Sequence, residues 1–334
     1  MEFEKIGVIG GGSWGTALAN LIASKSHRVD LWVREKEVYE EIRGEGENKT
    51  FLPGVRLSSN IRPSLDIEEV FRDKDLLVVA VPSHVFREVM TPIYHSLSSK
   101  TRLLVATKGI ENQSLMLMSQ ITSSLLGEEV LNRYACLGGP SFAKEVAKGL
   151  PTVVTIASKD LGLARALQLF MHTEWFRVYV TEDVMGVQLA GALKNVIAIA
   201  AGMCDSLGFG HNTRAALITR GLVEITRLGL RMGAEARTFA GLAGLGDLVL
   251  TCTSDLSRNR TFGYKIGAGM TVEEILSTTR MVAEGLRTSK SAYNLSKIYG
   301  CDMPITEQVY QILYEGKPPK EAAKEVMTRS LKEE

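Results

Sequence analysis

Cysteine is scarce in this 334-residue chain, which has four copies. The four residues, Cys136, Cys204, Cys252 and Cys301, are scattered, form no C-x-x-C pair and have no histidine at ligand spacing. A disulfide framework or a structural zinc site is therefore not expected. Reduced thiols in a cytoplasm are the simplest interpretation, and we expect no metal site.

An excess of charge of either sign is also missing. The chain has 39 basic and 38 acidic residues, which gives a formal net charge of +1. A balance this even leaves no electrostatic footprint for nucleic acid or for an anionic membrane surface. Any anionic ligand must then be bound by a local cluster of basic groups.

Long uninterrupted apolar runs are absent as well. The nearest candidate, residues 184–203, is interrupted by Lys194 and Asn195, whereas a membrane-spanning helix needs about 18 or more apolar residues. The first residues, MEFEKIGVIGGG, lack the basic start and apolar core of a secretory signal. We therefore expect a cytoplasmic globular protein that does not insert into a membrane.

The pattern along the chain indicates two domains, as its length suggests. In the first half, short β-branched runs at 5–9, 28–33, 76–80, 102–106, 134–137, 152–156 and 176–179 are typical of strands. Helical periodicity lies between them, for example at 14–24, 115–126 and 161–172. This alternation predicts a doubly wound α/β fold with a mostly parallel sheet covered on both faces.

After residue 181 the chain becomes helical in pattern and rich in alanine and glycine. Small residues let helices approach closely, so a compact all-α domain is expected. We place the domain boundary near residue 181, which gives domains 1–181 and 182–334. The small-residue helices leave a homodimer open.

Gly10, Gly12 and Gly15 form a G-x-G-x-x-G motif that follows the first predicted strand and opens a helix at Ser13 and Trp14. The first glycine makes the tight turn, the second lets a pyrophosphate approach the backbone, and the third lets the helix pack on the strand. The helix N-terminus then attracts phosphate. We predict a Rossmann-type dinucleotide-binding domain, with a plain tight βα turn as the alternative.

The residue after the second strand bears on the choice of dinucleotide. An NAD-specific site carries an acidic residue near the end of this strand, whereas this chain has Val33 and Arg34 there, with Glu35 just beyond. A guanidinium can bind a 2′-phosphate in a bidentate manner, which favours NADP(H). The alternative is that Arg34 stacks over the adenine or points into solvent.

Two further turns follow strands in the same layer. Lys108 comes directly after the strand at 102–106, and Gly139 and Ser141 come after the next strand. Loops at the carboxyl ends of parallel strands are where such sheets bind ligands. An isolated lysine after a strand is most often a solvated surface charge, but the tight turn favours a functional role here.

Lys194 stands next to Asn195 in GVQLAGALKNVIAIAAG, a helix made otherwise of apolar and small residues. Burial of an ammonium is costly without partners, so a lysine is rarely placed there for packing; the alternative is a side chain that reaches the helix end. If Lys194 lies near Lys108, repulsion and burial both favour its neutral form. Such a lysine can exchange a proton with a carbonyl or alcohol oxygen.

Downstream, the segment AGLAGLGDLVLTCTSDLSRNRTFG contains the polar residues Asp247, Thr251, Ser257, Arg258 and Asn259. The glycines before Asp247 suggest a close turn that aims its carboxylate inward, where it could hold Lys194 and accept its hydrogen bond. Ser257 has the chemistry of a helix N-cap, with Arg258 and Asn259 in the first turn. Such an N-terminus is a good phosphate site, and a solvent-facing basic loop is the alternative.

The assembled motifs closely resemble those of the bacterial NAD(P)-dependent glycerol-3-phosphate dehydrogenases. GGGSWGTALA, VATKGIE, GGPSFAKE, GALKNVIAI, GLAGLGDLVLTC and SRNR occur in that family's order over almost the whole chain. The resemblance implies that dihydroxyacetone phosphate and sn-glycerol 3-phosphate are interconverted with NAD(H) or NADP(H), for phospholipid synthesis. It also implies hydride transfer to C2, with Lys194 donating the proton.

The resemblance also implies roles for individual residues. The cofactor contacts are Gly10, Gly12, Ser13, Trp14, Gly15, Arg34, Lys108, Ala143, Arg258, Val282 and Glu284. The substrate contacts are Lys108, Gly139, Ser141, Lys194, Asn195, Asp247, Thr251, Ser257, Arg258 and Asn259. Lys194 resembles the catalytic acid/base, with Lys108 and Asp247 as its catalytic partners. Val282 and Glu284 are the least specific matches.

Two other interpretations remain open. A 3-hydroxyacid dehydrogenase related to 6-phosphogluconate dehydrogenase also carries Lys and Asn on a helix, but usually four residues apart, whereas Lys194 and Asn195 are adjacent. A non-catalytic dinucleotide sensor would keep the glycine motif without needing Lys108, Lys194 and Asp247 together. The full set of residues favours the phosphate-binding dehydrogenase.

Overall fold

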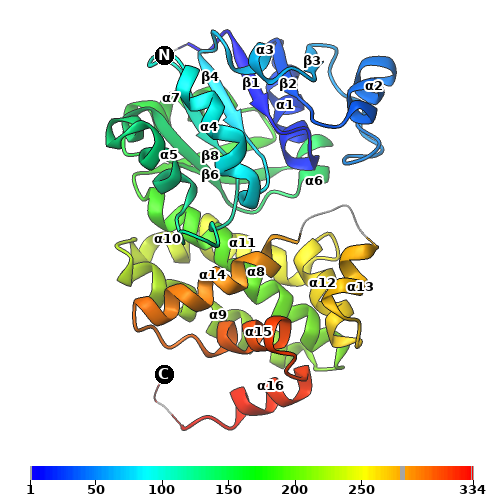
Figure 1. Cartoon of the computed structure of the whole chain (residues 1–334), viewed down its shortest axis with the longest axis vertical. Coiled ribbons are helices and arrows are strands. Elements are labelled where there is room, and N and C mark those ends of the chain that lie inside the picture. The colour runs from blue at the N-terminus through cyan, green and yellow to red at the C-terminus, as the bar shows by residue number, and fades with distance from the viewer. Residues whose placement is uncertain (1, 279–282, 332, 334) are drawn as a thin grey trace. The chain divides into compact units, whose positions relative to one another are not determined.

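The computed structural model of the chain describes residues 2–278, 283–331 and 333 (Figure 1). The chain divides into two compact units. The sheet unit contains residues 1–108 and 117–188, and the helical unit contains residues 109–116 and 189–334. The long helix α8 (Val184–Ser206) begins in the sheet unit and continues in the helical unit.

The sheet unit is built on eight strands in the order β3-β2-β1-β4-β5-β6-β7-β8. Their bounds are β1 Ile6–Ile9, β2 Val29–Trp32, β3 Ile61–Ser64, β4 Leu76–Val79, β5 Arg102–Val105, β6 Tyr134–Gly138, β7 Thr152–Ala157 and β8 Phe176–Thr181. All neighbouring pairs are parallel except β6 with β7. The predicted α/β fold with a mostly parallel sheet is confirmed.

One strand, β3, was not predicted from the sequence. The seven predicted strands are all present, but β3 has the sequence IRPS, which contains a charge and a proline. Proline cannot donate to a ladder and is confined to edges, and β3 is an edge strand that pairs only with β2 in the described chain. A strand this short and polar has no alternating pattern to reveal it.

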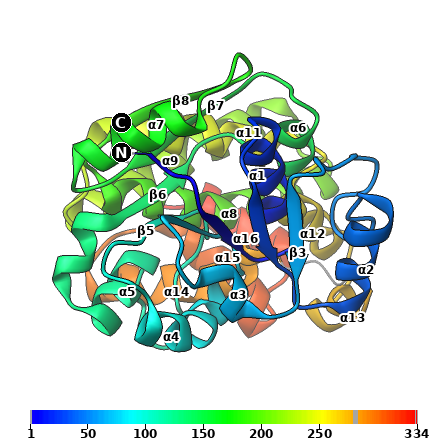
Figure 2. The same ribbon diagram turned by 90° about the horizontal axis from the view of Figure 1, so that it is seen from above.

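Helices cover both faces of the sheet. Their bounds are α1 Ser13–Ser24, α2 Lys36–Glu45, α3 Ile67–Phe71, α4 Phe86–Ser96, α5 Met118–Leu126, α6 Ala143–Ala147 and α7 Leu161–Met171, with short 3-10 turns η1 Ser83–Val85 and η2 Glu128–Arg133. Figure 2 shows α1, α6 and α7 on one side of the sheet and α3, α4 and α5 on the other. Because both faces are covered, β1 and β4 are buried along their whole length.

The helix expected at 115–126 begins later than predicted. Leu115 has a φ of +60°, which no α-helix accepts, so α5 begins at Met118. The backbone N–H of Leu117 donates to the Gln120 side chain at 2.8 Å, which closes the start of the helix. The apolar periodicity of the sequence extends to residues before Met118, but the backbone there is not helical.

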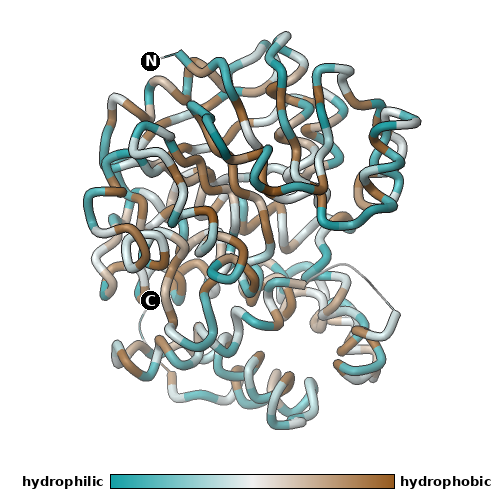
Figure 3. The backbone as a smooth tube through the Cα atoms, turned by 45° about the horizontal axis from the view of Figure 1, so that its top comes forward, coloured by the Kyte–Doolittle hydropathy of each residue, from teal (hydrophilic) through white to brown (hydrophobic). Residues whose placement is uncertain are grey.

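In the described part of the helical unit, all regular elements are helices. After α8 they are α9 His211–Arg231, α10 Ala236–Ala240, η3 Leu242–Gly246, α11 Asp247–Thr253, α12 Arg258–Gly267, α13 Val272–Ser277, α14 Glu284–Ile298, α15 Pro304–Glu315 and α16 Pro319–Met327. Hydrophobic and hydrophilic stretches alternate along their backbone (Figure 3). This alternation is typical of helices that bury one face.

Helix α8 is long and largely apolar. Among the described residues it is the one helix that is long and apolar enough to span a membrane, and 94% of its most apolar window is buried inside the protein. A core helix of a folded domain has the same composition. Lys194 and Asn195, which interrupt this run, are themselves buried.

Candidate active site

The glycine motif forms the expected turn between β1 and α1. Gly10 has a φ of +118°, which strongly favours glycine. A Cβ on Gly15 would lie 1.9 Å from the carbonyl oxygen of Gly10, so α1 packs directly on the loop. By contrast, a Cβ on Gly12 would meet nothing within 4 Å, so the space beside Gly12 is open.

A second loop, which contains Asn48 and Phe51, forms hydrogen bonds with this turn. The amide nitrogen of Asn48, which is fully buried, donates to the carbonyl oxygen of Gly11 at 2.9 Å and to the hydroxyl of Thr16 at 2.8 Å. The hydroxyl of Ser13 donates to the carbonyl oxygen of Phe51 at 2.6 Å. Sequence reasoning missed Asn48, because a single asparagine in a loop carries no spacing signal.

The loop fits a dinucleotide phosphate on two observations. The space beside Gly12 is open, and the N-terminus of α1 directs backbone N–H groups there. The indole Nε1 of Trp14 is buried and has no hydrogen-bond partner among the described residues. A buried donor without a partner is costly, and a bound acceptor group is one way to satisfy it.

The predicted 2′-phosphate ligand Arg34 lies directly after β2. Its side chain is 74% exposed, and its Nη2 contacts the carboxylate of Glu35 at 2.7 Å. Its Nε donates to the same Glu35 oxygen at 3.0 Å. A 2′-phosphate would therefore compete with Glu35 for this guanidinium.

The two further turns of the sheet unit converge on one carbonyl group. Lys108 donates from Nζ to the carbonyl oxygen of Gly139 at 3.3 Å, and the hydroxyl of Ser141 donates to the same oxygen at 3.0 Å. Gly139 has a φ of +116°, a backbone conformation that favours glycine. Ala143 begins α6 immediately afterwards. Lys108, Gly139 and Ser141 thus form one cluster at the ends of β5 and β6.

In the helical unit, Lys194 forms a buried ion pair with Asp247. The ammonium of Lys194 donates to a carboxylate oxygen of Asp247 and, at 2.9 Å, to the hydroxyl of Thr251. The side chains of Lys194 and Asp247 are 9% and 1% exposed. The predicted hydrogen bond between these two residues is confirmed. Because a buried ammonium needs such partners, α8 and α11 are held together at this point.

Asp247 is aimed inward by an irregular helix, where the sequence suggested a close turn. Residues Leu242–Gly246 form a π-helical turn, η3, that runs directly into α11 at Asp247. A Cβ on Gly244 would lie 2.1 Å from the carbonyl oxygen of Phe239, so this wide turn requires glycine there. Such π turns redirect the following side chains and are frequent at functional sites.

Asn195 and Asn259 bind each other across α8 and α12. The amide nitrogen of Asn259 donates to Oδ1 of Asn195 at 2.9 Å. Oδ1 of Asn259 accepts from the backbone N–H of Gly285 at 2.9 Å, next to Glu284 at the start of α14. These two predicted contact residues therefore also tie three helices together, a role that their sequence spacing did not indicate.

The start of α12 has the predicted form. Ser257 is the N-cap, and its hydroxyl accepts from the backbone N–H of Arg260 at 3.2 Å. Arg258 and Asn259 occupy the first turn, and the charge of Glu284 acts on Arg258. Val282, the remaining predicted cofactor contact, lies outside the described residues.

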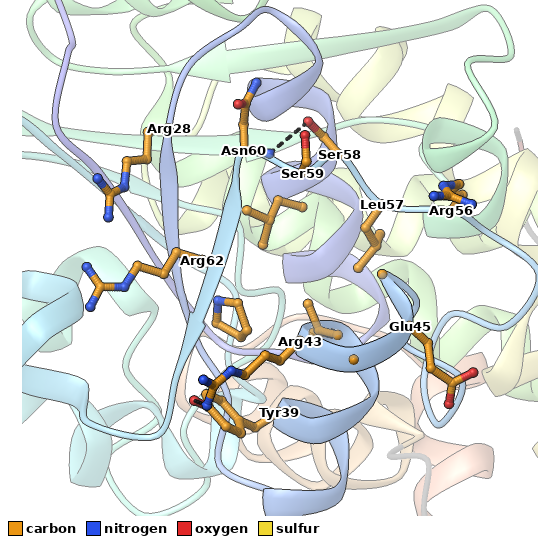
Figure 4. Close-up of a pocket in the computed structure, with 15 residues that line it drawn as sticks. Arg28, Tyr39, Arg43, Glu45, Arg56, Leu57, Ser58, Ser59, Asn60 and Arg62 are labelled. Atoms are coloured by element: carbon orange, nitrogen blue, oxygen red, sulfur yellow. Dashed lines mark hydrogen bonds between the residues drawn. The ribbon is translucent and has the colours of Figure 1, made fainter.

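One groove of the sheet unit lies away from these residues. It has a volume of about 920 Å³ and is lined by residues of α2, β3 and the preceding loop. Figure 4 shows its four arginines, Arg28, Arg43, Arg56 and Arg62, around β3. The groove is at the N-terminal ends of β2 and β3, whereas a doubly wound sheet binds its dinucleotide at the carboxyl ends. We do not assign the cofactor to it.

Two clusters thus carry the candidate chemistry. The glycine-loop cluster comprises Gly10, Gly12, Ser13, Trp14, Gly15 and Arg34, with Lys108, Gly139, Ser141 and Ala143 on the neighbouring loops of the sheet unit. The Lys194 cluster comprises Lys194, Asn195, Asp247, Thr251, Ser257, Arg258, Asn259 and Glu284 in the helical unit. The first has the geometry of a phosphate-binding loop, and the second has that of a buried acid/base group.

Comparisons with known proteins show the family of the chain. Residues 5–164 match the family described as the NAD-dependent glycerol-3-phosphate dehydrogenase N-terminus, and residues 183–324 match its C-terminus. The chain is 54% identical over 331 residues to a glycerol-3-phosphate dehydrogenase (NAD(P)+) of Geobacter metallireducens, which covers 99% of each chain. A protein of the same name from Leptospira biflexa is 48% identical over 330 residues, also 99% of each chain.

A comparison with solved structures points to the same family. It is similar to the crystal structure of glycerol-3-phosphate dehydrogenase from Coxiella burnetii, with a TM-score of 0.92 and 39% identity over 97% of this chain and 98% of that chain. The two family matches together span most of the sequence, and the relatives match it from end to end. The chain therefore belongs to the NAD-dependent glycerol-3-phosphate dehydrogenase family.

Proposed function

We propose that this protein catalyses the reversible reduction of dihydroxyacetone phosphate to sn-glycerol 3-phosphate with NAD(P)H. The observation that carries the proposal is the buried ion pair of Lys194 and Asp247, in a chain whose relatives are named for this reaction. A dehydrogenase needs a group that exchanges a proton with the substrate oxygen. Lys194 is such a group, held in place on a rigid helix.

The glycine-loop cluster binds the dinucleotide in this proposal. Gly12 and the N-terminus of α1 receive the pyrophosphate, and the indole N–H of Trp14 gains a hydrogen-bond partner. When bound, the nicotinamide supplies the hydride that converts the C2 ketone into an alcohol. Arg34 favours NADP(H), because its guanidinium suits a 2′-phosphate once it leaves Glu35.

Lys194 handles the proton. In the direction of reduction, the ammonium of Lys194 donates a proton to the C2 oxygen and stabilises the negative charge that develops there. Asp247 keeps the lysine charged and oriented beforehand, and Thr251 fixes its Nζ from a second side. In the reverse direction, neutral Lys194 accepts the proton of the alcohol. Lys108 assists electrostatically.

The first turn of α12 binds the substrate phosphate. Arg258 supplies a guanidinium, Asn259 an amide, and the Ser257 cap fixes the turn from which both project. Phosphate binding at a distance from C2 holds the ketone at reaction distance, so part of the binding energy lowers the barrier of the chemical step.

The domain boundary near residue 181, a cytoplasmic location and phospholipid synthesis as the fate of the product are part of the same proposal. The dinucleotide would then belong to residues 1–181, and the acid/base chemistry to residues 182–334. A homodimer stays a prediction.

The first experiment follows the oxidation of NADPH at 340 nm with dihydroxyacetone phosphate, with parallel assays that use NADH and unphosphorylated dihydroxyacetone. We expect rapid turnover with dihydroxyacetone phosphate and much slower, measurable turnover with unphosphorylated dihydroxyacetone. Lys194→Ala should lower kcat by about two orders of magnitude or more while the cofactor still binds. No turnover with either cofactor, despite a tight NADPH complex, would reject the proposed reaction and favour a hydroxyacid dehydrogenase or a sensor.

A further inference from the structure

The carboxylate of Asp205 joins three helices of the helical unit at the C-terminal end of α8. Its Oδ1 accepts a hydrogen bond from Nε of Arg214 on α9 at 3.0 Å. Its Oδ2 accepts from Nε of Arg260 on α12 at 2.7 Å. The side chains of Asp205 and Arg260 are 7% and 15% exposed, so this pair is largely removed from water. An exposed pair would contribute little, but a shielded one with this geometry restrains both helices.

The two helices joined by this pair, α8 and α12, touch each other through their backbones. A Cβ on Gly202 would lie 1.9 Å from the carbonyl oxygen of Arg260, and a Cβ on Gly263 would lie 2.0 Å from that of Ile199. Because glycines form the contact, the two backbones lie very close to each other. Side-chain contacts beside the glycines add to the restraint on the register of the two helices.

Two such contacts are present in the described chain. One is the amide pair Asn195–Asn259, at 2.9 Å, and the other is the ion pair Asp205–Arg260. Arg260 is further held by Asp255, whose Oδ1 accepts from Nη1 of Arg260 at 2.5 Å. Because Asp255 is highly exposed, its contact adds less than that of Asp205.

Arg260 belongs to the same turn as the phosphate-binding residues of the proposed function. Its backbone N–H donates to the Ser257 cap, and Arg258 and Asn259 are its two preceding neighbours. A movement of Arg260 therefore moves the whole first turn of α12. The sequence motif SRNR ends in this arginine, and the proposed chemistry leaves it without a role.

We propose that Arg260 is a positioning residue for recognition of the substrate phosphate: its ion pair with Asp205 fixes the first turn of α12, and with it Arg258 and Asn259, relative to Lys194 on α8. This inference rests on the proposed function. It concerns phosphate binding alone, since a ketone without a phosphate does not use this turn.

The test compares Arg260→Gln with Arg214→Gln. Both variants remove one arginine from Asp205, but Arg214 lies on α9, which carries none of the proposed contact residues. We expect Arg260→Gln to lower kcat/KM for dihydroxyacetone phosphate by about 10- to 100-fold, mostly through KM, because displacements of about 1 Å can cost this much. Its kcat/KM for unphosphorylated dihydroxyacetone should stay within about two-fold. Arg214→Gln should leave both values near those of the wild type.

Two further variants separate position from charge. Asp205→Asn keeps Arg260 but removes the anion that holds it, and should show the same selective loss. Arg260→Lys keeps one charged contact and should recover part of the activity with the phosphorylated ketone. An unchanged Asp205→Asn variant would overturn the inference, because Arg260 would then act on the substrate directly. Equal losses with both ketones would also overturn it, as expected of a purely structural residue.

Folding and the proposed reaction are controlled separately. Thermal unfolding of each variant shows whether it is folded, and Arg260→Lys carries the same comparison if Arg260→Gln does not fold. Wild-type enzyme that does not prefer the phosphorylated ketone would reject the proposed function itself. Wild-type enzyme with that preference, together with an Asp205→Asn variant that is folded and retains it in full, would reject only the positioning role.

Discussion

The ammonium of Lys194 and the carboxylate of Asp247 form an ion pair inside the helical unit, and neither side chain is more than 9% exposed. Removal of one partner would leave the other charge buried without compensation, which is far costlier than loss of an exposed pair. In the proposed reaction Lys194 exchanges the proton, and a carboxylate at this distance favours the ammonium form of a lysine.

Asp247→Asn should therefore change the pH dependence of the reaction. A nearby carboxylate favours the ammonium form, so its loss lowers the pKa of Lys194. Reduction needs the ammonium, and the alkaline limb of kcat against pH should move to lower pH, with kcat at neutral pH reduced by about ten-fold or more. A profile that keeps its shape and only loses height would show that Asp247 does not tune the lysine. Thr251→Val, which removes a neutral partner, is the matched control.

The glycine loop offers a pair of variants with opposite consequences. Gly15→Ala places a Cβ 1.9 Å from a backbone oxygen, so we expect it to destabilise the fold by about 1–3 kcal/mol. Gly12→Ala fills open space and should leave the thermal unfolding temperature nearly unchanged, yet weaken NADPH binding, because its methyl group takes the place of the pyrophosphate. Calorimetry and fluorescence titration measure the two effects. A Gly12→Ala variant with full cofactor affinity would argue against phosphate at this position.

Cofactor preference should depend on the competition for Arg34. Arg34→Ala removes the guanidinium and should raise KM for NADPH by about ten-fold, with little change for NADH. Glu35→Gln removes the anion that contacts Arg34 and should shift the preference towards NADPH. The ratio of kcat/KM for the two cofactors measures both variants. An equal effect on both cofactors would place Arg34 at the adenine or in solvent.

Stability should depend on pH through Glu224 on α9. Burial raises the pKa of its carboxyl to about 7, although it accepts hydrogen bonds from the backbone N–H groups of Ile305 and Thr306. The folded state therefore binds a proton more tightly than the unfolded state. The resulting stabilisation is complete below the unfolded pKa of about 4.5 and is lost as the pH rises to about 7, an effect of about 3 kcal/mol.

Glu224→Gln tests this contribution. The free energy of unfolding of the wild type, minus that of the variant, should fall as the pH rises from about 4.5 to 7 and then level off. Urea titrations at several pH values give this difference directly. A difference that rises with pH over the same range would mean that the carboxylate, held by the start of α15, is the more stable form.

Much of this architecture was accessible from the sequence, because periodic patterns report burial. The strands β1 and β4 are apolar throughout, and the glycine motif fixed the place of the first turn. What escaped the pattern was local and polar. The edge strand β3 has too few apolar residues to be recognised, and Leu115 interrupts a helical pattern through its backbone conformation alone.

The same distinction applies to the site. Contacts between residues distant in the chain could be inferred where burial of an unpaired charge would be costly. The ion pair of buried Lys194 with Asp247 is the example. Asn48 and the Asn195–Asn259 pair were not foreseeable, since neutral amides can be satisfied in many ways and leave no unpaired charge to explain. The roles of the individual site residues stay predictions until they are measured.

The position of Lys194 near the middle of the long apolar helix α8 has a consequence for the chain before it folds. A newly made chain presents α8 as a stretch of membrane-spanning length, and a lysine at the middle of such a stretch disfavours its insertion into a bilayer by about 2.5–3.5 kcal/mol. The side chain proposed for proton exchange therefore also makes α8 a poorer membrane-spanning segment. Lys194→Leu would remove both the proposed proton-exchanging group and the charge that disfavours membrane insertion.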